Sequence, residues 1–181
     1  KMKEVRMILS DLGMKVLSLK EAGIQADIVE DGKTFEENAI KKVNAIRPYT
    51  DGIILADDSG LEVDALDKKP GIYSARFMGE DTPYERKNQA IIDALKDVPD
   101  EKRTARFVCV IAAGMPDGTV RTTRGTIEGV IARKPAGEGG FGYDPIVYVP
   151  ELHKTTAELT PEQKNEVSHR GKALRAMKEE I

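Results

Sequence analysis

The sequence predicts an α/β fold with a mixed, twisted sheet flanked by helices. Segments with helical apolar spacing alternate along the chain with short β-rich runs, which is typical of this class. Two of the runs, residues 106–112 and 120–131, are separated by Pro116-Asp117-Gly118, a hairpin turn signal. Because this antiparallel hairpin interrupts the alternation, we expect a mixed sheet.

The first third of the chain predicts helix, strand and helix in this order. The opening helix ends at Gly13, and its apolar residues have helical spacing: Val5, Ile8, Leu9 and Leu12. Residues 15–19 alternate in the manner of a strand. Thr34-Phe35-Glu36-Glu37 is a capping box that starts the second helix, and Pro48 stops it. One face of that helix is apolar: Ala39, Ile40, Val43 and Ile46.

Residues 53–56 indicate a short buried strand, and Ser59-Gly60 indicates the turn that follows it. Thr82-Pro83-Tyr84-Glu85 opens another helix, whose inward residues are Ile91, Ile92 and Leu95. After the hairpin, a Gly-rich loop over residues 137–142 leads to a last strand at 146–149.

Two helices are expected at the end of the chain. One starts at Thr160-Pro161-Glu162-Gln163, and Ser168 caps the other. The second helix turns Leu174, Met177 and Ile181 inward.

Length and charge limit the possible functions. We expect residues 1–181 to form one domain that buries roughly 70% of its unfolded surface. A net charge of −3 argues against a general nucleic-acid or membrane-surface partner. Cys109 is the single cysteine, so it forms no internal disulfide, and its apolar neighbours predict a buried strand thiol. No apolar run approaches ~20 residues and no signal-peptide pattern opens the chain, so we expect a cytoplasmic protein.

The most informative stretch is Leu55-Ala56-Asp57-Asp58-Ser59-Gly60-Leu61. The predicted turn carries the two adjacent acids out of the sheet at its edge, where ligand clefts of α/β folds lie. Adjacent carboxylates are costly unless a cation compensates them, and a divalent metal is the usual one. An acidic surface turn is the alternative.

Glu37 is a candidate second ligand for the same metal. Magnesium prefers oxygen ligands, usually one or two carboxylates together with substrate phosphates. Glu37 and Asp58 would supply these, although Glu37 also has the position of a capping residue that bonds back to Thr34. Lys42 projects from another side of that helix, toward either a phosphate or solvent.

Phe141-Gly142-Tyr143-Asp144-Pro145 follows the Gly-rich loop and is a candidate base-binding segment. An aromatic ring on such a loop can stack on a nucleobase, and Asp144 can accept hydrogen bonds from ring N–H groups. The alternative is a β-turn with a phenylalanine in the core.

Lys164, His169 and Arg170 form a candidate anion-binding group. The Ser168 cap puts His169 and Arg170 in the first turn of a helix, where the macrodipole disfavours cations and attracts anions. Basic residues there suit an anionic ligand, with a solvated surface pair as the alternative. Gly171 weakens the same turn, which a closely approaching ligand or backbone would explain.

Taken together, these segments resemble the inosine/xanthosine triphosphate pyrophosphatase family, which hydrolyses non-standard purine nucleoside triphosphates. The resemblance runs along the whole chain in five blocks: residues 34–39, 55–61, 70–76, 141–145 and 157–171. It implies two lobes with the active-site cleft between them, a homodimer, Mg²⁺ as the cofactor and a purine nucleoside triphosphate as the substrate.

The resemblance also implies a role for each matching residue. Asp58 is the expected general base and a metal ligand, Glu37 a metal ligand, and Asp57 a supporting residue. The expected substrate-binding residues are Lys1, Lys42, Ser59, Phe141, Gly142, Tyr143, Asp144, Lys164, His169 and Arg170.

The chain departs from the family at its first residues. Family members begin with a strand and a Thr/Ser-x-Asn-x-x-Lys phosphate loop, of which residues 1–4 match only the end, with Lys1 in the lysine position.

Two other functions stay open: that of a related pyrophosphatase acting on pyrimidine or modified nucleotides, and that of a nucleotide-binding protein without catalysis.

Overall fold

The computed structural model describes residues 2–181, so Lys1 and its expected role lie outside the described residues. The helices are α1 (Met2–Leu9), α2 (Phe35–Ile46), α3 (Tyr84–Ala94), α4 (Pro161–Val167) and α5 (His169–Lys178). The strands are β1 (Ile54–Val63), β2 (Lys69–Pro70), β3 (Thr104–Gly114), β4 (Val120–Ile131), β5 (Val147–Val149) and β6 (Lys154–Thr155). None of the helices in residues 2–181 is both long and apolar enough to cross a membrane.

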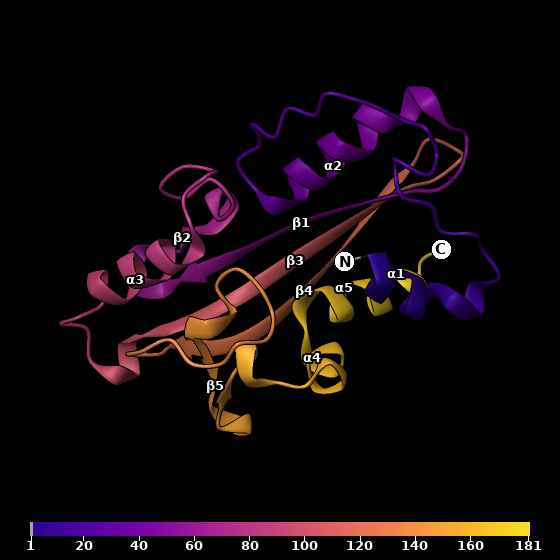
Figure 1. Ribbon diagram of the computed structural model, residues 1–181. Helices are drawn as coiled ribbons and strands as arrows, with labels where there is room; N and C mark the ends of the chain where they lie inside the picture. Colours follow the sequence, from indigo (N-terminus) through magenta and orange to yellow (C-terminus); the bar gives the residue numbers. More distant parts are fainter. Residues whose placement is uncertain (1) are drawn as a thin grey trace. The chain divides into compact units, whose positions relative to one another are not determined.

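The strands form one sheet in the order β2-β1-β3-β4-β5-β6 (Figure 1). Antiparallel pairing joins β1 to β2, β4 to β5 and β5 to β6. The predicted hairpin joins β3 to β4, and Asp117 stabilises its turn by accepting a hydrogen bond from the Thr119 backbone N–H at 2.9 Å. The α/β fold class is therefore confirmed, while the short strands β2 and β6 were not predicted.

The chain divides into two compact units. Unit 1 comprises residues 1–58, 109–125 and 168–181, and unit 2 comprises residues 59–108 and 126–167. The single domain over 1–181 and the cleft between two lobes stay predictions.

In unit 1, α1 and α5 lie side by side (Figure 1). Leu174 and Met177 of α5 are buried as predicted and pack with Cys109 of β3, whose thiol is fully buried. Gly125 of β4 lets α5 approach closely, because an added Cβ there would lie 2.3 Å from the carbonyl oxygen of His169. This contact fixes the first turn of α5.

The strand predicted at residues 15–19 is wrong. Residues 14–18 have no regular structure and residues 19–23 form turns. Leu17 and Leu19 are 44% and 41% exposed, and both line a cavity of about 640 Å³ in unit 1. Among the described residues no strand pairs with this segment, and alternation cannot make a strand without a partner for its backbone N–H and C=O groups.

The predicted turn at Ser59-Gly60 is also wrong. β1 continues to Val63, so Asp57 and Asp58 lie inside the strand instead of on a turn after it. Leu61 and Val63 are fully buried, and their burial keeps the chain in the sheet beyond Gly60. Pairing and burial thus override the turn propensity of Ser-Gly.

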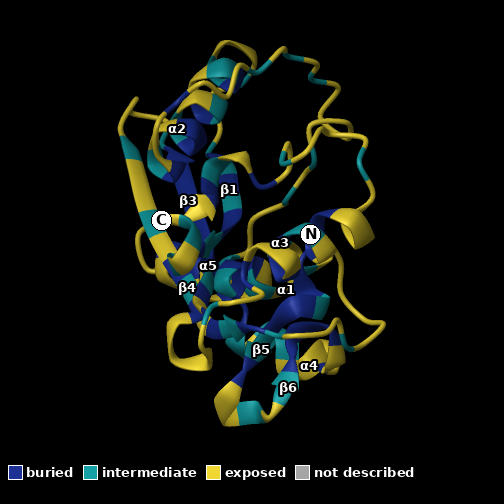
Figure 2. Cartoon of the chain, turned by 90° about the vertical axis from the view of Figure 1, so that its left-hand side faces the viewer, coloured by how far each residue is buried: buried dark blue, intermediate teal, exposed yellow. Residues whose placement is uncertain are grey.

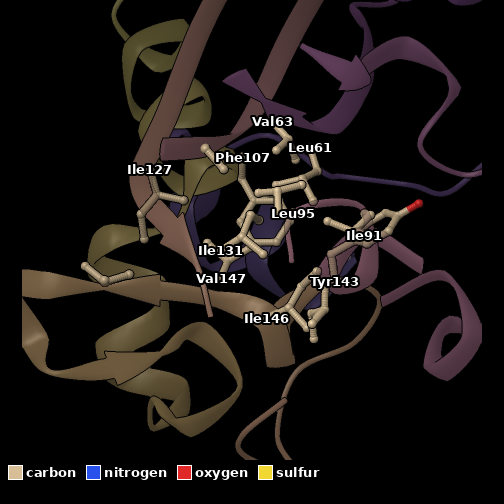
Figure 3. Close-up of a cluster of buried hydrophobic side chains, with 13 residues drawn as sticks. Leu61, Val63, Ile91, Leu95, Phe107, Ile127, Ile131, Tyr143, Ile146 and Val147 are labelled. Atoms are coloured by element: carbon tan, nitrogen blue, oxygen red, sulfur yellow. The ribbon is translucent and has the colours of Figure 1, made fainter. Parts of the chain in front are cut away.

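The core of unit 2 lies between α3 and the sheet (Figure 3). Ile91 of α3 and Leu95, which directly follows the helix, are fully buried, as their spacing predicts, and pack with Leu61 and Val63 of β1. β3 is almost entirely buried, whereas β4 has many exposed residues (Figure 2).

The predicted helix caps are largely confirmed. Thr160 and Gln163 exchange two hydrogen bonds at the start of α4. Ser168 Oγ accepts from the Gly171 backbone N–H at 2.9 Å at the start of α5. The hydroxyl of Thr82 does not cap α3, because it donates to the Met78 carbonyl oxygen instead.

Candidate active site

α2 starts at the predicted cap, but the Glu37 carboxylate has a different hydrogen-bond partner from the predicted one. Thr34 Oγ1 accepts a hydrogen bond from the Glu37 backbone N–H at 3.0 Å. The Glu37 carboxylate accepts at 2.6 Å from the backbone N–H of Lys33, and not from that of Thr34. Glu37 is exposed, so its carboxylate both stabilises the helix start and faces solvent.

Lys42 lies against the two aspartates of β1. Its Nζ donates to the Asp57 carbonyl oxygen at 2.8 Å, lies 3.4 Å from Asp58 Oδ1 and pairs with Glu30 Oε1 at 2.8 Å. Asn38 is buried one helical turn earlier, and its Oδ1 accepts from the Gly32 backbone N–H. The reading in which Lys42 points only to solvent is therefore wrong. We call Glu30, Asn38, Lys42, Asp57, Asp58 and Arg170 the Asp58 group.

Asp58 is a buried carboxylate of the Asp58 group with one oxygen that lacks a hydrogen-bond partner. It is 8% exposed, and its buried Oδ2 has no hydrogen-bond partner. Burial raises the pKa of Asp58 above its usual value, although Lys42 and Asn38 act in the opposite direction. The pKa of Lys42 is raised as well, because its hydrogen bond to Glu30 and the nearby acids outweigh burial. Asp58 is thus a buried base with one accepting oxygen available.

Arg170 is buried in the first turn of α5. Its Nε lies 3.3 Å from Asp57 Oδ2, and its Nη1 lies 3.9 Å from Glu4 Oε2. The cap residue Ser168 also donates to Glu4, at 2.8 Å. The carboxylates of Asp57 and Glu4 therefore compensate part of the positive charge of Arg170, which the sequence analysis had assigned to an anionic ligand. His169, the preceding residue, is half-buried.

The buried charge of the Asp58 carboxylate fits a divalent cation. Within residues 2–181, no group of three or more His, Cys, Asp or Glu side chains is arranged to hold a metal. A cation there would have one or two carboxylates and would complete its shell from phosphate and water, which is how magnesium usually binds.

In unit 2, the predicted base-binding segment is a loop with an exposed aromatic ring. Phe141 is 67% exposed, so the reading as a core phenylalanine is wrong. Lys164 Nζ lies 4.6 Å from the centre of the Phe141 ring and forms an ion pair with Asp144. We call residues 141–144 the aromatic loop.

Asp144 holds the aromatic loop together. It is 4% exposed, and its Oδ2 accepts from the Phe141 backbone N–H at 2.9 Å as well as from Lys164. Its Oδ1 accepts from the Thr156 hydroxyl at 2.7 Å. Gly140 has a φ of +71°, and an added Cβ would lie 2.2 Å from Asp144 Oδ2. The carboxylate is thus committed to loop contacts on both oxygens.

Tyr143 is buried beneath the exposed part of the loop. Its hydroxyl donates to the Ser74 carbonyl oxygen at 2.5 Å, and burial raises the pKa of the phenol. Its ring meets Tyr84 of α3 edge to face, with 5.1 Å between centroids. Ser59, the remaining candidate in unit 2, lies half-buried in β1.

Sequence reasoning missed several residues that support these candidates: Glu30, Asn38, Ser74, Tyr84 and Thr156. Asn38 carried a usable signal, because an amide on the apolar face of an amphipathic helix needs a buried partner. Glu30 and Thr156 had no such signal, since each meets its partner only through the tertiary fold.

The Ham1 family model matches residues 1–180. The chain belongs to the Ham1 family. A curated relative from Clostridium perfringens, named dITP/XTP pyrophosphatase, is 48% identical over 100% of this chain and 92% of its own length. One with the same name from Desulforamulus reducens is 51% identical over 97% of this chain and 87% of its own. The solved structure of a HAM1 protein from Coxiella burnetii matches with a TM-score of 0.90 and 41% identity, covering 98% of this chain and 90% of that one.

Proposed function

We propose that this chain hydrolyses non-standard purine nucleoside triphosphates such as ITP, dITP and XTP to the monophosphate and pyrophosphate. The observation that carries the proposal is the buried Asp58 carboxylate, with Lys42 beside Oδ1 and no partner at Oδ2. Family relatives at 48% and 51% identity that are named dITP/XTP pyrophosphatase support it. The reaction would remove deaminated purines from the nucleotide pool.

Asp58 acts as the general base. Its Oδ2 accepts a proton from a water molecule, whose oxygen then attacks the α-phosphorus while the bond to the bridging oxygen breaks and pyrophosphate leaves. Because burial raises its pKa, this carboxylate is a stronger proton acceptor than an exposed aspartate. Asp57, paired with Arg170, supports the strand that carries Asp58.

The cations of the candidate site bind the charged part of the substrate. Lys42 contacts the triphosphate from the Asp58 group, and Lys164, His169 and Arg170 contact the nucleotide, together with Ser59. Such contacts position the substrate and stabilise the charge that develops as pyrophosphate leaves.

Asp58 and Glu37 are the residues proposed to hold Mg²⁺. When bound, the ion neutralises negative charge on the bridging oxygen and the leaving pyrophosphate. The exposed position of Glu37 supports this assignment.

The aromatic loop binds the purine. Phe141 stacks on the base, a contact worth about 1–3 kcal/mol for nucleobases. Gly142, Tyr143 and Asp144 shape the pocket, and selectivity for the base comes from buried donors directed at the purine 6-oxygen. Because the 6-amino group of adenine would leave these donors unpaired, a site of this kind can discriminate by roughly 10⁴–10⁵.

We also propose that the protein forms a homodimer and acts in the cytoplasm.

The test compares pyrophosphate release from ITP, XTP, GTP, ATP and dTTP with Mg²⁺ present. Fastest release from ITP or XTP is the expected result. A preference for dTTP would favour a pyrimidine-directed enzyme, and ITP that binds in calorimetry but stays intact would favour a non-catalytic binding protein. Either result would overturn the proposal.

A further inference from the structure

Asn88 of α3 is a buried polar residue that the proposed mechanism does not use. It is 4% exposed, and its Nδ2 donates to the Gly142 carbonyl oxygen at 3.1 Å. Its Oδ1 is buried without a hydrogen-bond partner. An unsatisfied buried acceptor is rare and destabilising, so a contribution to stability does not explain an amide here. The bond to Gly142 is the contact that an amide provides and an apolar side chain of equal size does not.

Two residues of α3 contact the aromatic loop, Tyr84 and Asn88, and Lys87 lies on the same face of the helix. The Tyr84 ring packs on Tyr143, and one of its carbons would lie 3.6 Å from a Cβ on Gly142. Lys87 is fully buried, lies over the Tyr84 ring and donates to the Ala75 carbonyl oxygen at 2.9 Å. This face of α3 therefore packs against the backbone of residues 142–143.

The direction of the Phe141 ring depends on few fixed points. The ring is 67% exposed, so core packing does not hold it. The loop before it contains Gly139 and Gly140, and Gly142 follows with a φ of +62°, so the backbone around the ring is easily rotated. Asp144 fixes the Phe141 N–H, and Asn88 fixes the Gly142 carbonyl on the other side of the residue.

We propose that Asn88 is a positioning residue for purine binding: by holding the Gly142 carbonyl, it sets the direction in which Phe141 presents its ring to the base. This inference rests on the proposed function, since it takes the aromatic loop as the base-binding segment. Asn88 itself contacts no substrate.

The experiment measures the binding of inosine monophosphate and of pyrophosphate by calorimetry for the full chain and its variants. Asn88→Leu keeps the size of the side chain and removes the donor. We expect Kd for inosine monophosphate to rise about two- to tenfold, the loss of one hydrogen bond, with Kd for pyrophosphate unchanged. A merely structural role would change both constants or neither, and either of these results would overturn the inference.

Asn88→Asp provides a second readout and does not depend on the leucine variant being folded. The introduced carboxyl donates to the Gly142 carbonyl while neutral and loses that proton as the pH rises. The ratio of its Kd for inosine monophosphate to the wild-type Kd should be near one at acidic pH and increase toward alkaline pH. A ratio that stays flat across pH would contradict the inference.

Gln89→Leu is the matched control, because Gln89 is the exposed neighbour on α3 and bonds only along the helix, to Asp93. It should leave both binding constants unchanged. Failure of the wild-type chain to release pyrophosphate from ITP would overturn the proposed function, whereas this inference is judged on the binding constants of the two products. The two failures are therefore distinguishable.

Discussion

The Lys42 ammonium lies 3.4 Å from one carboxylate oxygen of Asp58, while the other oxygen of Asp58 is buried without a partner. This asymmetry divides the roles of the carboxylate. One oxygen keeps the negative charge close to a cation, and the second is available to accept a proton. An acidic surface turn, the alternative that the sequence left open, would have solvent on both oxygens.

The first prediction concerns Asp58→Asn. The amide keeps the shape of the side chain but cannot accept a proton from water, so turnover of ITP should fall by about 10²–10⁴. Binding of ITP should largely remain and is measured by calorimetry beside pyrophosphate release. Asp51→Asn, at an exposed position of unit 1, is the control. Turnover that survives in Asp58→Asn would remove Asp58 from the role of general base.

The second prediction concerns the buried ion pair of Arg170 and Asp57, whose side chains are 11% and 8% exposed. Arg170→Met leaves the Asp57 carboxylate buried without this partner, so the free energy of unfolding in urea should fall by about 3 kcal/mol. Adding Asp57→Asn to this variant should recover part of the loss, because the uncompensated charge is then gone. Strictly additive losses would show that the two residues are not coupled.

The third prediction concerns Phe141→Ala. The exposed ring contributes little to the core, so the free energy of unfolding should change by less than about 1 kcal/mol. KM for ITP should rise about tenfold, the equivalent of one lost base-stacking contact. Phe107→Ala is the contrasting control, since Phe107 is 7% exposed in the unit 2 core and its loss should cost about 3–5 kcal/mol. An unchanged KM in Phe141→Ala would exclude stacking by this ring.

The fourth prediction concerns stability at acidic pH. Arg106 donates to both oxygens of Asp64, at 3.0 and 2.8 Å, and this hydrogen bonding lowers the pKa of the carboxyl below its usual value of 3.8. The folded-state pKa is therefore below the unfolded one. The stabilisation is present above the unfolded pKa and is lost as the pH falls through the folded pKa.

Asp64→Asn should accordingly reduce the free energy of unfolding by about 1–2 kcal/mol at pH 7, and by less as the pH falls below about 4. Urea titrations at a series of pH values measure this difference. Asp97→Asn, at an exposed carboxylate of the same unit, is the control and should leave the free energy of unfolding at pH 7 nearly unchanged. A difference that grows toward acidic pH would have the wrong sign for this pair.

Sequence patterns predicted those elements whose signals are local. Caps depend on residues three or four positions apart, so Thr34 and Ser168 were assigned correctly at the starts of α2 and α5. Apolar spacing likewise predicted which side of α3 and α5 is buried. The blocks of residues that resemble a nucleotide pyrophosphatase family agreed with membership in the Ham1 family.

Patterns failed where a distant partner decides the outcome. Residues 15–19 alternate but pair with no described strand, and Ser59-Gly60 resembles a turn yet stays in the sheet. Lys42 could not be assigned to phosphate or solvent from its position on α2, because its partners are on other segments.

The amino-acid order alone thus determined where most helices start, the buried faces and the kinds of residue available for chemistry, since each depends on neighbours within one or two turns. Only the tertiary structure decided that Asp58 is buried with one oxygen open, that Arg170 is paired with Asp57, and that Asn88 holds the aromatic loop. Burial and pairing depend on segments that are far apart in the chain, and those contacts exist only once it is folded.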